Sequence, residues 1–141
     1  MKKSTLSVIL GTLLGALLVF GFQMEEAELG KRMKAVGKGM GAVKKGMKTG
    51  DMAAAGEGAD AIATNLDGTE KFWSAHKVAD AVKLTSDGVA AAKALAVAAK
   101  AGKADEAKEA SAKLGATCKG CHDQYREKTG ENEYKVKLPA H

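Results

Sequence analysis

Residues 104–128, ADEAKEASAKLGATCKGCHDQYREK, are the part of the sequence from which the fold can be worked out. Small, apolar or thiol side chains recur in this stretch every three or four residues, which is typical of one face of an α-helix. They are Ala107, Ser111, Leu114, Cys118, Cys121 and Tyr125. Gly130 follows as a stop signal. The pattern predicts a helix over 104–128 with both cysteines on its core face.

Within this helix, Cys118-Lys119-Gly120-Cys121-His122 has the spacing of a covalent attachment site for a c-type haem. Residues i and i+3 share a helix face, so both thiols can reach one edge of a porphyrin. His122 then lies where its imidazole can ligate iron, and we expect Gly120 to leave room for the ring. The predicted cofactor is one covalently bound haem c with its iron.

Other interpretations of the motif are weaker. A structural zinc site uses four ligands, but the chain has two cysteines and three histidines, and His76 and His141 lack the spacing of a ligand pair. A thioredoxin-like dithiol would need a βαβ setting, and no strand pattern surrounds the motif. The remaining alternative is a chance match in a helix.

Three more helices are predicted before this one, over about 24–48, 52–66 and 70–100, joined by short turns. The first has an unbroken heptad-type stripe of apolar residues: Leu29, Met33, Val36, Met40, Val43 and Met47. Asp51 is a good N-cap for the second helix. The predicted fold is all-α: an antiparallel up-down-up-down four-helix bundle with covalent haem c between the first and last helices.

The predicted first helix contains five glycines, each of which costs about 1 kcal/mol relative to alanine. They are Gly30, Gly37, Gly39, Gly41 and Gly46. A helix that tolerates them is expected to be approached closely by a neighbouring helix or by a large planar group.

The chain ends are predicted to lie outside the bundle domain, residues 22–130. Residues 1–21 have a short basic start and an apolar run, typical of a secretory signal peptide, with an uncleaved anchor as the alternative. Residues 131–141 are predicted to form a flexible C-terminal tail. The net charge of +5 falls to +3 without Lys2 and Lys3, since 20 basic and 17 acidic side chains remain. This mild balance suits an acidic protein partner and argues against nucleic-acid binding.

From Met24 to Lys128 the chain resembles the cytochrome c′ family. The resemblance rests on the haem motif in the last helix, on Tyr125-Arg126 after it, on Glu70-Lys71-Phe72-Trp73, and on Met40-Gly41. It implies the four-helix bundle and a haem c. Low-spin members of the family carry an iron-ligating methionine seven residues before the methionine of the Met-Gly pair. That position is Met33 here, so the resemblance implies the methionine-ligated, electron-carrying branch.

The residues alone leave single roles open. Met33 fits core packing as well as an axial ligand, although antiparallel first and last helices would place it at the same end of the bundle as His122. Arg126, one turn past His122, is either a solvated cation at the helix end or a partner for a haem propionate. Tyr125 is expected to pack on the haem or on the first helix, and His76 to lie at the core edge or surface.

The expected function is a periplasmic, exported one-electron carrier whose partners are redox proteins. The alternatives are a high-spin protein that binds nitric oxide or carbon monoxide, and a haem subunit of a larger redox complex. Membrane contact is expected only with an uncleaved leader, and the sequence leaves a homodimer open. We expect no enzymatic activity, because no serine, histidine and carboxylate set suggests catalysis.

Overall fold

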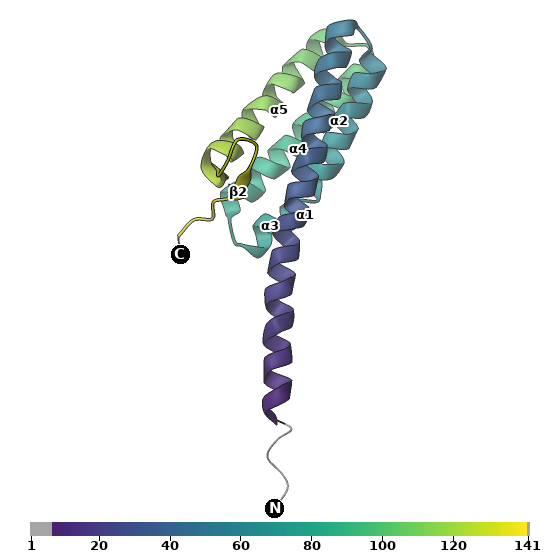
Figure 1. Cartoon of the computed structure of the whole chain (residues 1–141). Helices are drawn as coiled ribbons and strands as arrows, with labels where there is room; N and C mark the ends of the chain where they lie inside the picture. Colours follow the sequence, from purple (N-terminus) through teal and green to yellow (C-terminus); the bar gives the residue numbers. More distant parts are fainter. Residues whose placement is uncertain (1–6, 141) are drawn as a thin grey trace, which may run out of the picture.

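The computed structural model describes the backbone of residues 7–140 and the side chains of residues 26–140. Four long helices run alternately up and down within these residues (Figure 1), which confirms the predicted all-α four-helix bundle. They are α1 (Ser7–Thr49), α2 (Met52–Asp67), α4 (Ala79–Lys100) and α5 (Ala104–Tyr125). The side chains of the predicted leader, residues 1–21, lie outside the described residues.

The turns between the helices follow from local chemistry. Asp51 caps α2 as predicted, because its carboxylate accepts a hydrogen bond from the Ala54 N–H at 3.0 Å. Gly50 and Gly102 have φ values of 79° and 71°, which favour glycine. Each therefore reverses the chain between two antiparallel helices.

The predicted third helix over 70–100 is wrong in one respect, because the structure divides it. The short helix α3 (Glu70–Ala75) ends before Lys77, whose φ of 57° is left-handed, and α4 begins at Ala79. The break allows Phe72, Trp73 and Val78 all to be buried. Neither glycine nor proline marks the position, so tertiary burial determines it.

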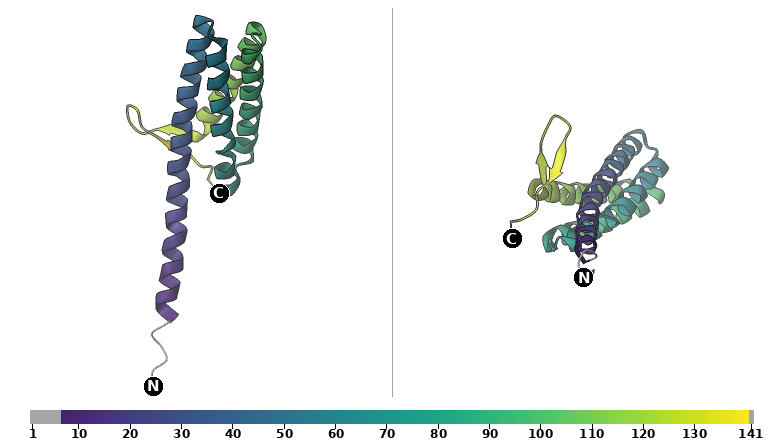
Figure 2. Two further views of the ribbon diagram at one scale, coloured as in Figure 1. Left: turned by 90° about the vertical axis from the view of Figure 1, so that its right-hand side faces the viewer. Right: turned by 60° about the horizontal axis from the view of Figure 1, so that its bottom comes forward.

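The C-terminal segment also differs from the expectation. The last helix ends at Tyr125, and Arg126–Lys128 form strand β1 in place of the helix predicted to residue 128. Strand β2 (Tyr134–Val136) pairs antiparallel with it and lies in the stretch expected to be a flexible tail. The Lys137 N–H donates to the Tyr125 carbonyl at 2.9 Å and holds this hairpin to the helix end. Figure 2 shows the hairpin standing out from the bundle at the end of α5.

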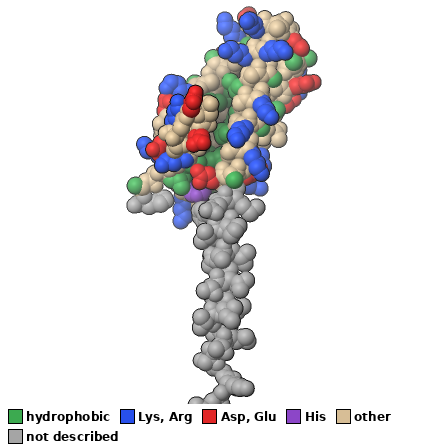
Figure 3. All heavy atoms as spheres, viewed as in Figure 1, with side chains coloured by type: hydrophobic (Ala, Val, Ile, Leu, Met, Phe, Trp, Pro, Cys, Tyr) green, Lys and Arg blue, Asp and Glu red, His purple; other side chains and the backbone are tan. Residues whose placement is uncertain are grey.

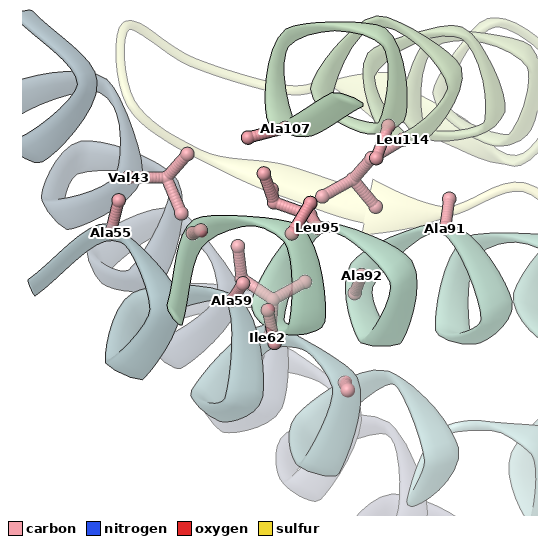
Figure 4. Close-up of a cluster of buried hydrophobic side chains, with 14 of the residues drawn as sticks. Val43, Ala55, Ala59, Ile62, Ala91, Ala92, Leu95, Ala107 and Leu114 are labelled. Carbon is pink, nitrogen blue, oxygen red and sulfur yellow. The ribbon is translucent and has the colours of Figure 1, made fainter. Parts of the chain in front are cut away.

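Buried hydrophobic side chains form two clusters. The main core fills the bundle between α1, α2, α4 and α5, with Ile62, Leu95 and Leu114 fully buried at its centre (Figure 4). A smaller group, here called the end cluster, lies at the other end of the molecule from the α1–α2 turn. It consists of Leu29, Phe72, Trp73, Val78, Ala81 and Tyr125.

The helices do not all pack on one another. Extensive contacts join α1 to α2, α2 to α4, and α4 to α5. In the described part of the chain, α1 and α5 do not pack along each other. Figure 1 shows these two helices diverging toward the end that carries the hairpin, and Figure 3 shows hydrophobic side chains between them.

Candidate functional site

The last turns of α5 carry the motif that the sequence singled out. Cys118 and Cys121 are both half-buried and unbridged. The Cys118 side chain packs against the main core, and the Cys121 side chain packs against the end cluster. The two thiols therefore lie at the boundary between the two hydrophobic groups.

His122 lies on the side of α5 that turns away from α4. Successive helical residues are about 100° apart, so His122 shares a side with Cys118, four residues earlier, and with Gly115, two turns earlier. A Cβ atom added to Gly115 would meet nothing within 4 Å. The side of α5 with the imidazole is thus bordered by open space.

Gly120 lies on the side of α5 that packs on α4. A Cβ atom on this residue would lie 3.5 Å from Leu84 Cδ2 of α4, so Gly120 faces the neighbouring helix. Gly115, which the sequence analysis did not single out, borders the open side of α5 that carries His122. Its spacing of seven residues from His122 could have indicated this, because residues two turns apart share one side of a helix.

Met33 is the candidate ligand on α1. Its side chain is half-buried and packs against both the main core and the end cluster. Gly30 and Gly37 lie three residues before it and four residues after it, on a neighbouring strip of the helix. A Cβ atom on either glycine would meet nothing within 4 Å. Helix α1 thus carries a thioether near open glycines, and α5 carries an imidazole and two thiols near another open glycine.

Contacts of the hairpin show that Met33 and His122 lie at the same end of the bundle. The Val136 N–H donates to Glu26 Oε1 at 3.4 Å, and Glu26 lies two turns before Met33 on α1. The neighbouring Lys137 N–H is bonded to Tyr125, three residues past His122. The part of α1 around Glu26 and the end of α5 are therefore neighbours, as expected for an antiparallel arrangement.

The electrostatic surroundings suit attachment and ligation better than thiol redox chemistry. Burial raises the pKa of Cys121 to about 11 and also raises the pKa of Cys118. Reactive dithiols instead have lowered pKa values, because the thiolate is their nucleophile. Burial, with help from the Arg126 charge, lowers the pKa of His122, so its imidazole is neutral and able to ligate a metal at pH 7.

Tyr125 is buried and stacks with Trp73, with ring centroids 5.3 Å apart. It contributes to the end cluster beneath the motif, and burial raises the pKa of its hydroxyl. Phe72 packs edge-on against Trp73 at 5.0 Å. His76 is half-buried with its Nδ1 atom 2.8 Å from the Phe72 carbonyl oxygen, which matches the expected core-edge position.

Arg126 is exposed as the first residue of β1, and its guanidinium lies 4.3 Å above the centre of the Tyr134 ring. Its backbone N–H donates to the His122 carbonyl. The sequence placed Arg126 one turn past His122 but gave no sign of the aromatic partner, because that contact depends on the hairpin.

Two further features, metal-binding clusters and membrane-spanning helices, are absent from the described residues. Within 26–140 no group of three or more histidine, cysteine or acidic side chains could hold a metal ion. Among the residues that the structure describes, no helix is long and apolar enough to cross a bilayer. A haem does fit the donor set, since two half-buried thiols and an imidazole lie together on α5 and a thioether lies on α1 at the same end of the bundle.

The bundle and the motif on its last helix define the class of a monohaem c-type cytochrome. The family model described as Cytochrome C' matches residues 56–126, half of the chain, and the chain belongs to this family. Membership implies a covalently bound haem c. The matched residues include the motif and exclude Met33. No curated protein and no solved structure matches the chain.

Proposed function

We propose that this cytochrome is an exported one-electron carrier whose iron is ligated by His122 and Met33. The observation that carries the proposal is the pair of open helix sides at one end of the bundle, with Met33 near Gly30 and Gly37 on α1 and His122 near Gly115 on α5. Both residues lie at the end of the bundle where Val136 joins Glu26. In this proposal Cys118 and Cys121 hold the haem by thioether bonds.

Each residue then has a distinct task. The haem supplies a one-electron couple, and a thioether ligand favours its ferrous state. Met33 fills the sixth coordination position and keeps external ligands away. Its half-buried position against two clusters supports a fixed side chain. Tyr125 supports the motif from below, and Arg126 supplies a positive charge one turn past His122.

Support for the proposed location and for the proposed partners comes from the sequence. The leader, residues 1–21, and the requirement to attach haem outside the cytoplasm support a periplasmic location. Exposed Lys31, Lys34 and Lys38 on α1 suit an acidic redox partner. Figure 3 shows lysine and arginine side chains spread over this part of the surface. Arg32 differs from these lysines, because its guanidinium lies against Gly68 and within 3.1 Å of Glu28.

The decisive experiment is Met33→Ala, with Met40→Ala as the matched control. Met40 is also half-buried against the main core and lies two turns further along α1. We expect the wild type and Met40→Ala to be low-spin and to bind carbon monoxide slowly when reduced. Met33→Ala should be high-spin and bind carbon monoxide readily.

Other outcomes would favour one of the alternative functions. A wild-type protein that is already high-spin and binds carbon monoxide readily would make it a gas-binding protein, with Met33 as core packing. Co-purification with a membrane complex would make it a redox subunit. Mass spectrometry of the mature chain tests the remaining parts, since it measures both the haem adduct on the chain and the position of leader cleavage.

A further inference from the structure

The C-terminal hairpin lies almost wholly beyond the residues that match the family, which end at Arg126. It is held in place at both sides of the candidate site. Lys137 bonds to the end of α5 at 2.9 Å, and Val136 bonds to Glu26 of α1 at 3.4 Å. The hairpin thus bridges the two helices that carry the proposed iron ligands.

One face of the hairpin is directed toward the bundle. Side chains alternate between the two faces of a strand, and the register pairs Arg126 with Val136 and Lys128 with Tyr134. These four residues therefore share a face. Of the four, only Val136 is half-buried and packs against the end cluster, whereas Arg126, Lys128 and Tyr134 are exposed.

The contact between Arg126 and Tyr134 is a diagonal pair on that face. The guanidinium lies 4.3 Å from the ring centre, within the range of a cation–π interaction. A free arginine at an exposed helix end samples many rotamers, whereas a stacked guanidinium is fixed and keeps its in-plane N–H donors free for a carboxylate. Arg126 is also tied to His122 through the backbone hydrogen bond at the helix end.

We propose that Tyr134 is a positioning residue that holds the Arg126 guanidinium close to the haem, where its charge favours the ferrous state. This inference rests on the proposed haem attachment at Cys118 and Cys121. A fixed positive charge stabilises the state with one more electron, and a mobile, fully hydrated one does so less. Tyr134 affects the reduction potential only through Arg126 and does not itself bind the iron or the thiols.

The test is a double-mutant cycle on the reduction potential of the haem-loaded protein. Tyr134→Val removes the ring but keeps strand propensity, and Tyr134→Phe keeps the ring. We expect Arg126→Gln to lower the potential, Tyr134→Val to lower it by a smaller amount, and Tyr134→Phe to retain the wild-type value. In the Arg126→Gln background, Tyr134→Val should have no further effect.

A matched control removes a charge elsewhere on α5. Lys108→Gln, about 21 Å along the helix from His122, should leave the potential unchanged. Equal shifts from Tyr134→Val with and without Arg126, or no shift at all, would overturn the inference while leaving the proposed function intact. A wild-type chain without a covalent haem mass would overturn both.

Discussion

Helix α1 has two glycine-bearing sides that differ in what an added side chain would meet. Toward α2, a Cβ atom on Gly39 would lie 2.7 Å from Ile62 Cγ1, and one on Gly46 would lie 2.6 Å from the Asp51 carbonyl oxygen. On another side, Gly30 and Gly37 are exposed, and an added Cβ atom would meet nothing within 4 Å. The first side is therefore shaped for close contact with another helix. The second has open space near Met33, where the proposed haem would lie.

The comparison shows that one residue type serves two purposes in one helix. Glycine costs about 1 kcal/mol relative to alanine in a helix interior. On the α2 side, close packing of the two helices offsets that cost. At Gly30 and Gly37 no protein contact offsets it, and in the proposed function a haem would occupy the space beside them.

Gly46→Ala should have the largest effect, because it acts on the closed side. The new methyl would lie 2.6 Å from the Asp51 oxygen and 2.8 Å from the Ala55 nitrogen, and neither backbone atom can move away cheaply. We expect a loss of about 2–3 kcal/mol in the free energy of unfolding. Urea unfolding followed by circular dichroism measures it.

Gly41→Ala is the control for this change. Gly41 lies on the same helix, is exposed, and has nothing within 4 Å of an added Cβ atom. The substitution should stabilise the protein by up to about 1 kcal/mol. If both variants were stabilised alike, the α1–α2 contact would be looser than described.

Gly37→Leu tests the open side and should separate protein stability from haem binding. In a Cys118→Ser/Cys121→Ser background, which cannot attach haem covalently, we expect the unfolding free energy to rise by about 0.5–1 kcal/mol from helix propensity. In the haem-loaded protein the leucine side chain should fill the open space near Met33 that the proposed haem needs. The low-spin fraction in the absorption spectrum should therefore fall.

Lys38→Leu is the control for Gly37→Leu, because residue 38 is exposed and lies about 100° further around the helix. It should leave the spectrum unchanged. A Gly37→Leu protein that retained a wild-type spectrum would show that the haem lies away from this side of α1.

Much of the fold could be predicted from the sequence, because helix periodicity and short turns act locally. The heptad stripe of α1 and the Asp51 cap are examples. The break at Lys77 and the hairpin could not be predicted. Both depend on burial of residues far apart in the chain, such as Val136 against the end cluster.

The candidate site shows a similar division. Cys118, Cys121 and His122 follow from spacing alone, and the structure places the two thiols between the main core and the end cluster. Which glycine borders the open side of α5 depends on the direction in which α4 packs. The motif therefore drew attention to Gly120 and not to Gly115. The ligand role of Met33 stays a prediction, since its half-buried position suits both packing and ligation.

The smallest expected effect concerns Glu26, the residue through which the hairpin reaches across the open side. Its carboxylate accepts a hydrogen bond from the Val136 N–H at 3.4 Å at an exposed position. A long, solvated bond should contribute no more than about 0.5 kcal/mol. Glu26→Ala should therefore leave global unfolding nearly unchanged and speed hydrogen exchange of the Val136 amide about twofold, as measured by NMR. Glu26→Gln keeps an acceptor oxygen and should show a smaller change. A loss of more than about 1.5 kcal/mol in Glu26→Ala would contradict the comparison of the two sides, because it would mean that the protein chain itself, rather than a group between α1 and α5, holds the open side together.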